Sequence, residues 1–193
     1  MQKHTRPSNW HTYPRCMPSS RSGAKNHDKQ LRYSIAFERI EAARRSGFFI
    51  EAIMLCESII TDRLVSHLAT RRQAGAPISV ATVRKYFDEC RSHMGEPTQT
   101  IGFVPAKHLV SALADHFDDH GDSRFNQLPE RLRTWLDDRN AAAHAFVKSH
   151  PLTKTFPEPM PVFEARLRSC SSDGLRLARA LDAWARRKAT KAL

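Results

Sequence analysis

The amino-acid sequence predicts an all-α protein, a helical bundle of about five to six helices. From residue 29 onward, apolar residues recur at spacings of three and four, which is the period of a helix with one buried face. No two alternating apolar and polar runs are joined by a hairpin signal, so nothing predicts a β-sheet. A chain of 193 residues, 40% of them hydrophobic, can bury one sizeable core. We therefore expect one helical domain over residues 29–193.

The first two helices are expected on either side of Gly47, and the second should be the long central helix. The inward positions of the first helix are Ile35, Ile40 and Ala43. Those of the second helix, each three or four residues from the next, are Phe49, Ile53, Cys56, Ile60, Leu64 and Leu68. Gly75 and Pro77 then end this helix.

The next three helices begin at cap or proline positions. Ser79 is a candidate N-cap for the third helix, the fourth starts near Pro105, and the fifth opens at Pro129, where proline suits a first helical turn. The inward positions of the third and fourth helices are Val83, Phe87, Met94, Leu109, Leu113 and Phe117.

The last helix follows a proline-rich, irregular connection over residues 150–161. It begins at Val162, has Gly174 as a candidate point of interruption, and carries Leu177, Leu181 and Trp184 on one side. Its C-terminal arginines and lysines could guide RNA, lie on an anionic membrane, or simply complement the negative end of the helix dipole.

Residues 1–28 form a predicted disordered basic arm, because they mix Pro, Ser, His, Arg and Lys without an apolar period. Residues 1–32 hold seven basic side chains against one acidic side chain, Asp28, which is +6 of the net charge of +11. Trp10 and Tyr13 lie between those charges and could stack on bases. The alternative is a solvated leader without a role.

The net charge predicts a polyanionic partner. Lysine and arginine total 31 against 20 acidic residues, and the pI is near 10.0, which leaves nucleic acid, an anionic membrane or an acidic protein open.

The four cysteines form no C-x-x-C pair, so neither a zinc knuckle nor a disulfide framework is indicated and a reducing cytoplasm fits best. The most apolar stretch carries Glu51 and Glu57 and is too short to cross a bilayer, so we expect no membrane partner.

The fifth helix places an arginine where a leucine is expected. At about 100° per residue, Arg139 falls inside an otherwise apolar face. The other members of that face are Leu132, Trp135, Leu136, Ala143, Phe146 and Val147. An arginine withdrawn from water without an anion or several acceptors costs several kcal/mol. An internal carboxylate or a captured phosphate would each meet that need, and a buried arginine–aspartate pair beside an edge histidine is the structural alternative.

Asn140 and His144 border the same face four residues apart, so they are neighbours on the helix surface. Three alanines, residues 141–143, keep this turn free of bulk and allow another helix or a ligand to approach. Glu57, Asp62 and Arg63 of the second helix are candidates for polar contacts to this region, although nothing in their spacing requires it.

The sequence "RNAAAH" matches the R-x4-H signature, in its frequent R-N-x-x-x-H form, and residues 30–190 resemble the HEPN family (higher eukaryotes and prokaryotes nucleotide-binding domains). The resemblance implies a metal-independent endoribonuclease of a toxin or defence system without a cofactor, often a homodimer whose two R-x4-H helices face each other. Arg139 and His144 would be the catalytic pair, with Asn140 beside them. Histidine can exchange protons near neutral pH, and a guanidinium can hold a phosphate.

One position departs from the family pattern. Many members paired with a nucleotidyltransferase antitoxin have a modified tyrosine two residues after the histidine, where this chain has Phe146. Phenylalanine has no hydroxyl to modify, so another antitoxin or regulatory partner would have to restrain the activity. The alternative functions are a non-catalytic HEPN-like module that binds RNA or a protein, and a basic helical adaptor unrelated to RNA.

A rival site lies in residues 115–122, "DHFDDHGD". His116 and His120 have the i, i+4 spacing of a helical metal pair, but Phe117 stands where H-E-x-x-H has its glutamate base. A solvated acidic helix end is the preferred interpretation. The segment could also pair with Arg139 or with a partner subunit.

Overall fold

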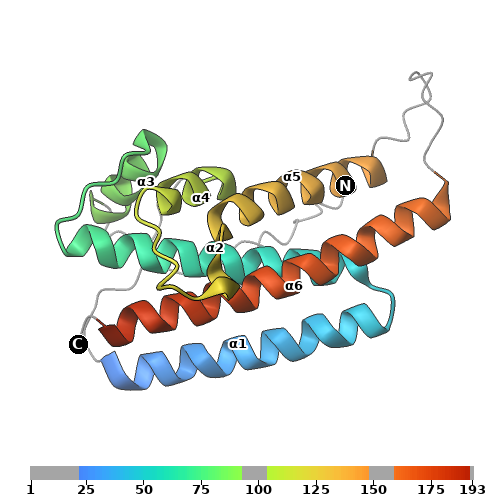
Figure 1. Ribbon diagram of the computed structural model, residues 1–193, viewed down its shortest axis with the longest axis horizontal. Helices are drawn as coiled ribbons and strands as arrows, with labels where there is room; N and C mark the ends of the chain where they lie inside the picture. Colours follow the sequence, from blue (N-terminus) through green and yellow to red (C-terminus); the bar gives the residue numbers. More distant parts are fainter. Residues whose placement is uncertain (1–21, 93–103, 148–158, 192–193) are drawn as a thin grey trace, which may run out of the picture.

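The computed structural model describes residues 22–92, 104–147 and 159–191. Within these ranges the chain is helical and contains no strand, which confirms the all-α prediction. The elements are α1 (Ser22–Arg45), α2 (Phe49–Gln73), α3 (Ala81–Ser92), α4 (Ala106–Ala114), the short 3-10 helix η1 (Ser123–Phe125), α5 (Leu128–Val147) and α6 (Met160–Lys191). Figure 1 shows α1, α2, α5 and α6 side by side along the long axis, with α3 and α4 at one end. The helices α2 and α6 run opposite to α1 and α5.

The helix α2 is the centre of the bundle, as predicted. All of its predicted inward positions are buried, together with Ala52 and Ile59. The helix ends where Gly75 adopts a φ of +78°, a left-handed conformation that glycine reaches without steric cost. The amides of Gly75 and Ala76 then donate to the carbonyls of Arg72 and Arg71, which satisfies the free end of the helix.

The helix α6 continues through Gly174, so the predicted interruption is wrong. Gly174 is needed there for close packing, because a Cβ at this position would lie 2.7 Å from the Trp135 ring of α5. The indole nitrogen of Trp135 donates to the carbonyl of Cys170 at 2.9 Å. Leu177, Leu181 and Trp184 are buried as predicted.

Two positions predicted from spacing differ in the structure. On α1, Ile35 is exposed and Tyr33 is buried. Tyr33 lies on the same face of the helix as the buried Ile40, and Ile35 lies about 200° around the helix from Tyr33. Ser79 is not the N-cap of α3, because the helix begins at Ala81 and the cap position is therefore residue 80; the Ser79 hydroxyl donates instead to the carboxylate of Asp115, just after α4.

The remaining boundaries shift only locally. The helix α1 begins at Ser22, so residues 22–28 of the predicted arm lie inside it; their sequence, SGAKNHD, has no large apolar residue that could mark a helical period. Residues 1–21, Met94 and most of the proline-rich connection lie outside the described residues. Phe117 follows the end of α4 and stacks on Trp184, with 5.4 Å between the ring centroids.

Candidate functional site

Arg139 lies on α5 with its guanidinium between two polar partners. Its Nη2 atom forms an ion pair with Glu57 of α2, and Nη1 donates to Asn140 Oδ1 at 2.6 Å. The side chain stays 26% exposed to solvent. The partner that this arginine requires is therefore an internal carboxylate, contributed by the central helix, and the guanidinium still reaches the surface.

Burial lowers the pKa of Arg139, and the neighbouring Cys170 of α6 acts in the opposite direction. Burial also raises the pKa of Cys170 to about 11 and that of Cys56 on α2 to about 12. Both thiols are therefore neutral at pH 7, and the negative charge beside Arg139 comes from Glu57.

His144 lies on the same helix, five residues after Arg139. Its backbone position is about 7.5 Å further along the axis and is rotated by about 140° around it. The side chains of His144, Phe146 and Val147 lie outside the described residues. Asn140 is exposed and stands between the two predicted catalytic positions.

In the alanine stretch of α5, the side of the helix that is buried differs from the one predicted. Leu132, Trp135 and Leu136 are buried as expected, but Ala142 is buried and Ala143 is exposed. In Figure 1 α4 lies near the N-terminal end of α5, and most of α5 extends away from α4. The helix α5 packs against α6 as well as α4, and its buried side in this stretch includes Ala142 but excludes Ala143.

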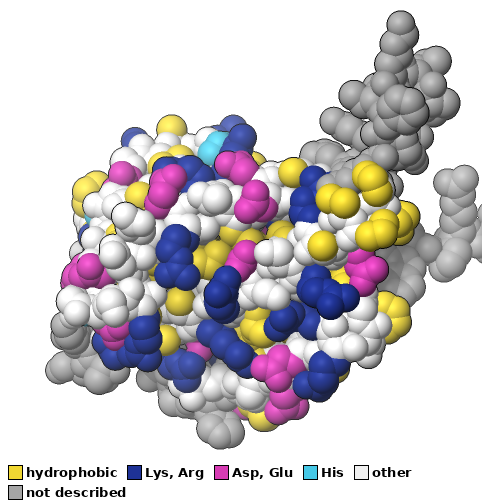
Figure 2. Space-filling view, turned by 45° about the vertical axis from the view of Figure 1, so that its right-hand side comes forward, with side chains coloured by type: hydrophobic (Ala, Val, Ile, Leu, Met, Phe, Trp, Pro, Cys, Tyr) yellow, Lys and Arg dark blue, Asp and Glu magenta, His cyan; other side chains and the backbone are white. Residues whose placement is uncertain are grey.

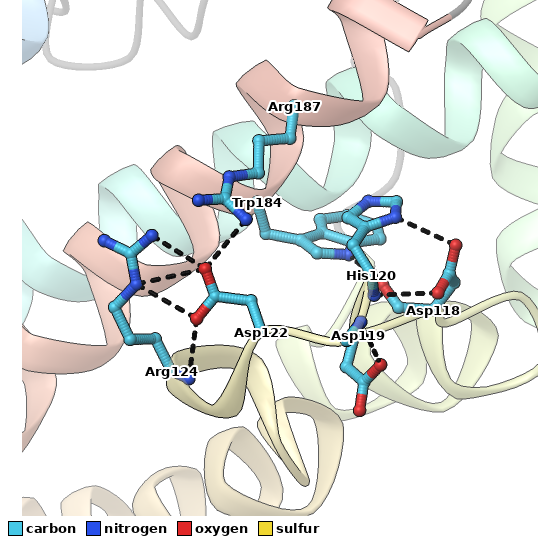
Figure 3. A network of polar contacts seen from close by, with 8 residues as sticks. Asp118, Asp119, His120, Asp122, Arg124, Trp184 and Arg187 are labelled. Carbon is cyan, nitrogen blue, oxygen red and sulfur yellow. Dashed lines mark hydrogen bonds and ion pairs between the residues drawn. The ribbon is translucent and has the colours of Figure 1, made fainter.

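The rival histidines have separate partners. The helix α4 ends at Ala114, so His116 and His120 do not share a helical face. The Nε2 atom of His116 bonds to the carbonyl of Pro77 at 2.9 Å, whereas Nδ1 of His120 lies 2.9 Å from Asp118 (Figure 3). Among the described residues, no three His, Cys, Asp or Glu side chains are grouped so that they could hold a metal ion.

The carboxylates of the same loop are satisfied locally and do not pair with Arg139. Figure 3 shows Asp122 between Arg124 and Arg187, each of which approaches it to 2.7 Å. Hydrogen bonds from Arg124 hold the pKa of Asp122 well below its usual range. The indole nitrogen of Trp184 donates to the carbonyl of Asp118 at 2.7 Å, which anchors the loop to α6.

A second set of charges lies inside the bundle and was not predicted. Asp182 of α6 is buried and forms ion pairs with Arg63 of α2 and Arg186 of α6. The guanidinium of Arg63 lies over the Tyr33 ring, 4.1 Å from its centroid, and the Tyr33 hydroxyl donates to Asp62. A buried aspartate between two arginines is a structural clamp between α1, α2 and α6.

Comparison of the chain with family models, curated proteins and solved structures found no match. No helix in the described ranges has both the length and the apolar character of a membrane span.

Proposed function

We propose that the protein is a metal-independent endoribonuclease of a toxin or defence type, with Arg139, Asn140 and His144 as its site. The observation that supports this best is the setting of Arg139. Its guanidinium is oriented by Glu57 and Asn140, is partly exposed, and precedes His144 by five residues on one helix. A pre-oriented cation that can hold a phosphate and a histidine that can move a proton are the two groups that metal-independent phosphodiester cleavage can use.

In the proposed reaction, a histidine removes the proton of the ribose 2′-hydroxyl, and the 2′-oxygen attacks the adjacent phosphorus. The bond from phosphorus to the 5′-oxygen breaks, and that oxygen receives a proton from a protonated histidine as it leaves. Arg139 holds the non-bridging oxygens, whose negative charge grows during the attack. The products are a 2′,3′-cyclic phosphate and a 5′-hydroxyl.

Incubation of the purified protein with end-labelled RNA tests the activity. We expect cleavage that continues in EDTA and leaves 2′,3′-cyclic phosphate ends, because no step of this reaction uses a metal. Cleavage that EDTA abolishes would contradict the mechanism.

The same proposal includes a homodimer in which two α5 helices face each other. His144 lies about 140° around the helix from Arg139, so a second copy would supply the other side of a composite site. The exposed small side chains of Ala141 and Ala143 would permit close approach. Light scattering should therefore give twice the chain mass at micromolar concentration, and a strict monomer with and without RNA would contradict the composite site.

A second candidate function is a non-catalytic HEPN-like module that binds RNA or a protein partner. One observation favours it: Arg139 already has a carboxylate and an amide as partners, which satisfies its charge without a substrate. RNA binding that depends on Arg139 without any cleavage would select this alternative. An antitoxin encoded beside this chain would favour the nuclease instead.

A further inference from the structure

A groove of about 790 Å³ lies between α1 and α6. In Figure 1 the helix α6 separates α1 from α5, so this groove lies on the opposite side of α6 from the helix that carries Arg139. Four arginines line it, and we call the surface they form the arginine groove: Arg44, Arg168, Arg176 and Arg179. Its volume is within the range of about 300–1,000 Å³ that is typical of ligand sites.

Three of these arginines are available to an anion. Arg168 pairs with Glu164 at 3.0 Å, while Arg176 and Arg179 pair with exposed carboxylates on α6 and α1. All three side chains are more than half exposed to solvent. Exposed ion pairs are worth at most about 1 kcal/mol, so a phosphate can displace these carboxylates at low cost. Figure 2 shows Lys and Arg side chains spread over the middle of one face, with fewer acidic side chains among them.

Arg44 differs from the other three because no described carboxylate pairs with it. Its Nη2 atom donates to the Ser172 hydroxyl at 2.6 Å, and its Nε atom is buried without an acceptor among the described residues. An arginine that is partly withdrawn from water needs an anion or several acceptors. The groove therefore holds a guanidinium and a hydroxyl that are suited to an incoming phosphate.

The arginines continue beyond the groove along α6. Arg168, Arg179 and Arg186 are eleven and seven residues apart, so they fall within about 20° of one another around the helix. The line from the first to the third is about 27 Å long. A line of cations of this length matches an extended polyanion better than a single small anion.

We propose that the arginine groove binds the sugar-phosphate backbone of single-stranded RNA, with one phosphate on Arg44 and Ser172. The choice of RNA rests on the proposed function. No aromatic side chain lines the groove among the described residues, so bases do not stack there. Binding is therefore insensitive to base sequence and strongly dependent on salt.

The test uses fluorescence anisotropy with a labelled 2′-O-methyl oligouridine of about 12 nucleotides. This probe lacks the 2′-hydroxyl, so its binding reports on the groove whether or not the protein cleaves RNA. Arg168→Ala/Arg176→Ala should weaken binding roughly tenfold at low salt and reduce the slope of log affinity against log salt by about 1.4. Both side chains are exposed, by 65% and 73%, so the fold should be retained.

The matched control is Lys85→Ala/Arg124→Ala. These side chains are 79% and 65% exposed, each pairs with a nearby carboxylate, and they lie outside the groove. The control removes the same charge and should change affinity less than twofold. Equal losses in the two double variants, or no loss in either, would overturn the proposal.

A separate variant, Arg44→Gln, tests the phosphate position. Glutamine can still bond to Ser172 but has no charge, so affinity should fall while the circular dichroism spectrum is unchanged. A folded Arg44→Gln protein with unchanged affinity would overturn the role of Arg44. If the groove variants lose binding in a protein that never cuts unmodified RNA, the groove stands and the nuclease proposal fails. If the protein cuts RNA and its groove variants bind the probe normally, the nuclease proposal stands and the groove proposal fails.

Discussion

Replacing either Arg139 or His144 with alanine is expected to lower the rate of RNA cleavage by about a hundredfold or more. Arg139→Ala removes the cation that stabilises the phosphate during attack, and His144→Ala removes the group that moves the proton. Gel assays of end-labelled RNA at saturating enzyme measure the cleavage step itself. Both variants should retain the helical circular dichroism spectrum.

Arg139→Ala also leaves Glu57 without its ion-pair partner, so a loss of activity has to be separated from a loss of stability. Arg139→Lys provides that separation, because it keeps a positive charge near Glu57 but loses the planar fork that holds two phosphate oxygens. We expect this variant to be folded and still impaired. Glu57→Gln should reduce activity less, since Asn140 continues to orient the guanidinium.

The matched control for His144 is the pair of histidines in the loop after α4. His116→Ala and His120→Ala remove contacts to Pro77 and Asp118 and should leave cleavage nearly unchanged. If these variants are inactive while His144→Ala cuts normally, the site has been assigned to the wrong histidine.

The long helices could be predicted from the sequence because their apolar spacing repeats over many turns. The helix α2 is the clearest case, since it is packed by α1, α4 and α6 and buries every predicted inward position. Burial predicted from the spacing of apolar residues was wrong where the neighbouring helix ends or turns away. Ala143 shares the predicted face of Leu132, yet it is exposed, whereas Ala142 is buried.

The polar contacts of the candidate site could be predicted only in part. The position of Arg139 in an apolar face indicated that it needs an anion, and this was correct. The identity of that anion depends on how α2 lies relative to α5. The spacing of residues within one helix gives no information about that arrangement. The role of Gly174 could not be predicted from spacing either, because the glycine is needed there to leave room for the Trp135 ring of another helix. The arginine groove likewise exists only after α1 and α6 are brought together.

The largest expected effect on stability belongs to Asp182→Ala. This change leaves Arg63, whose side chain is 12% exposed, without the carboxylate that it contacts inside the bundle. Removing one partner of a buried ion pair costs about 3–5 kcal/mol, because the remaining charge is neither hydrated nor paired. Urea unfolding followed by circular dichroism should show this loss as a lower midpoint.

Asp173→Ala is the matched control on the same helix, because the ion pair between Asp173 and Arg176 is exposed and should contribute less than about 1 kcal/mol. The double variant Arg63→Met/Asp182→Leu should recover part of the lost stability, since it removes both charges and keeps apolar volume in the core. If Asp182→Ala costs no more than Asp173→Ala, Arg63 has another source of compensation and the clamp between α1, α2 and α6 does not depend on Asp182. If the double variant is less stable than Asp182→Ala, Arg63 stabilises the bundle through its packing and its contact with the Tyr33 ring by more than its unpaired charge costs.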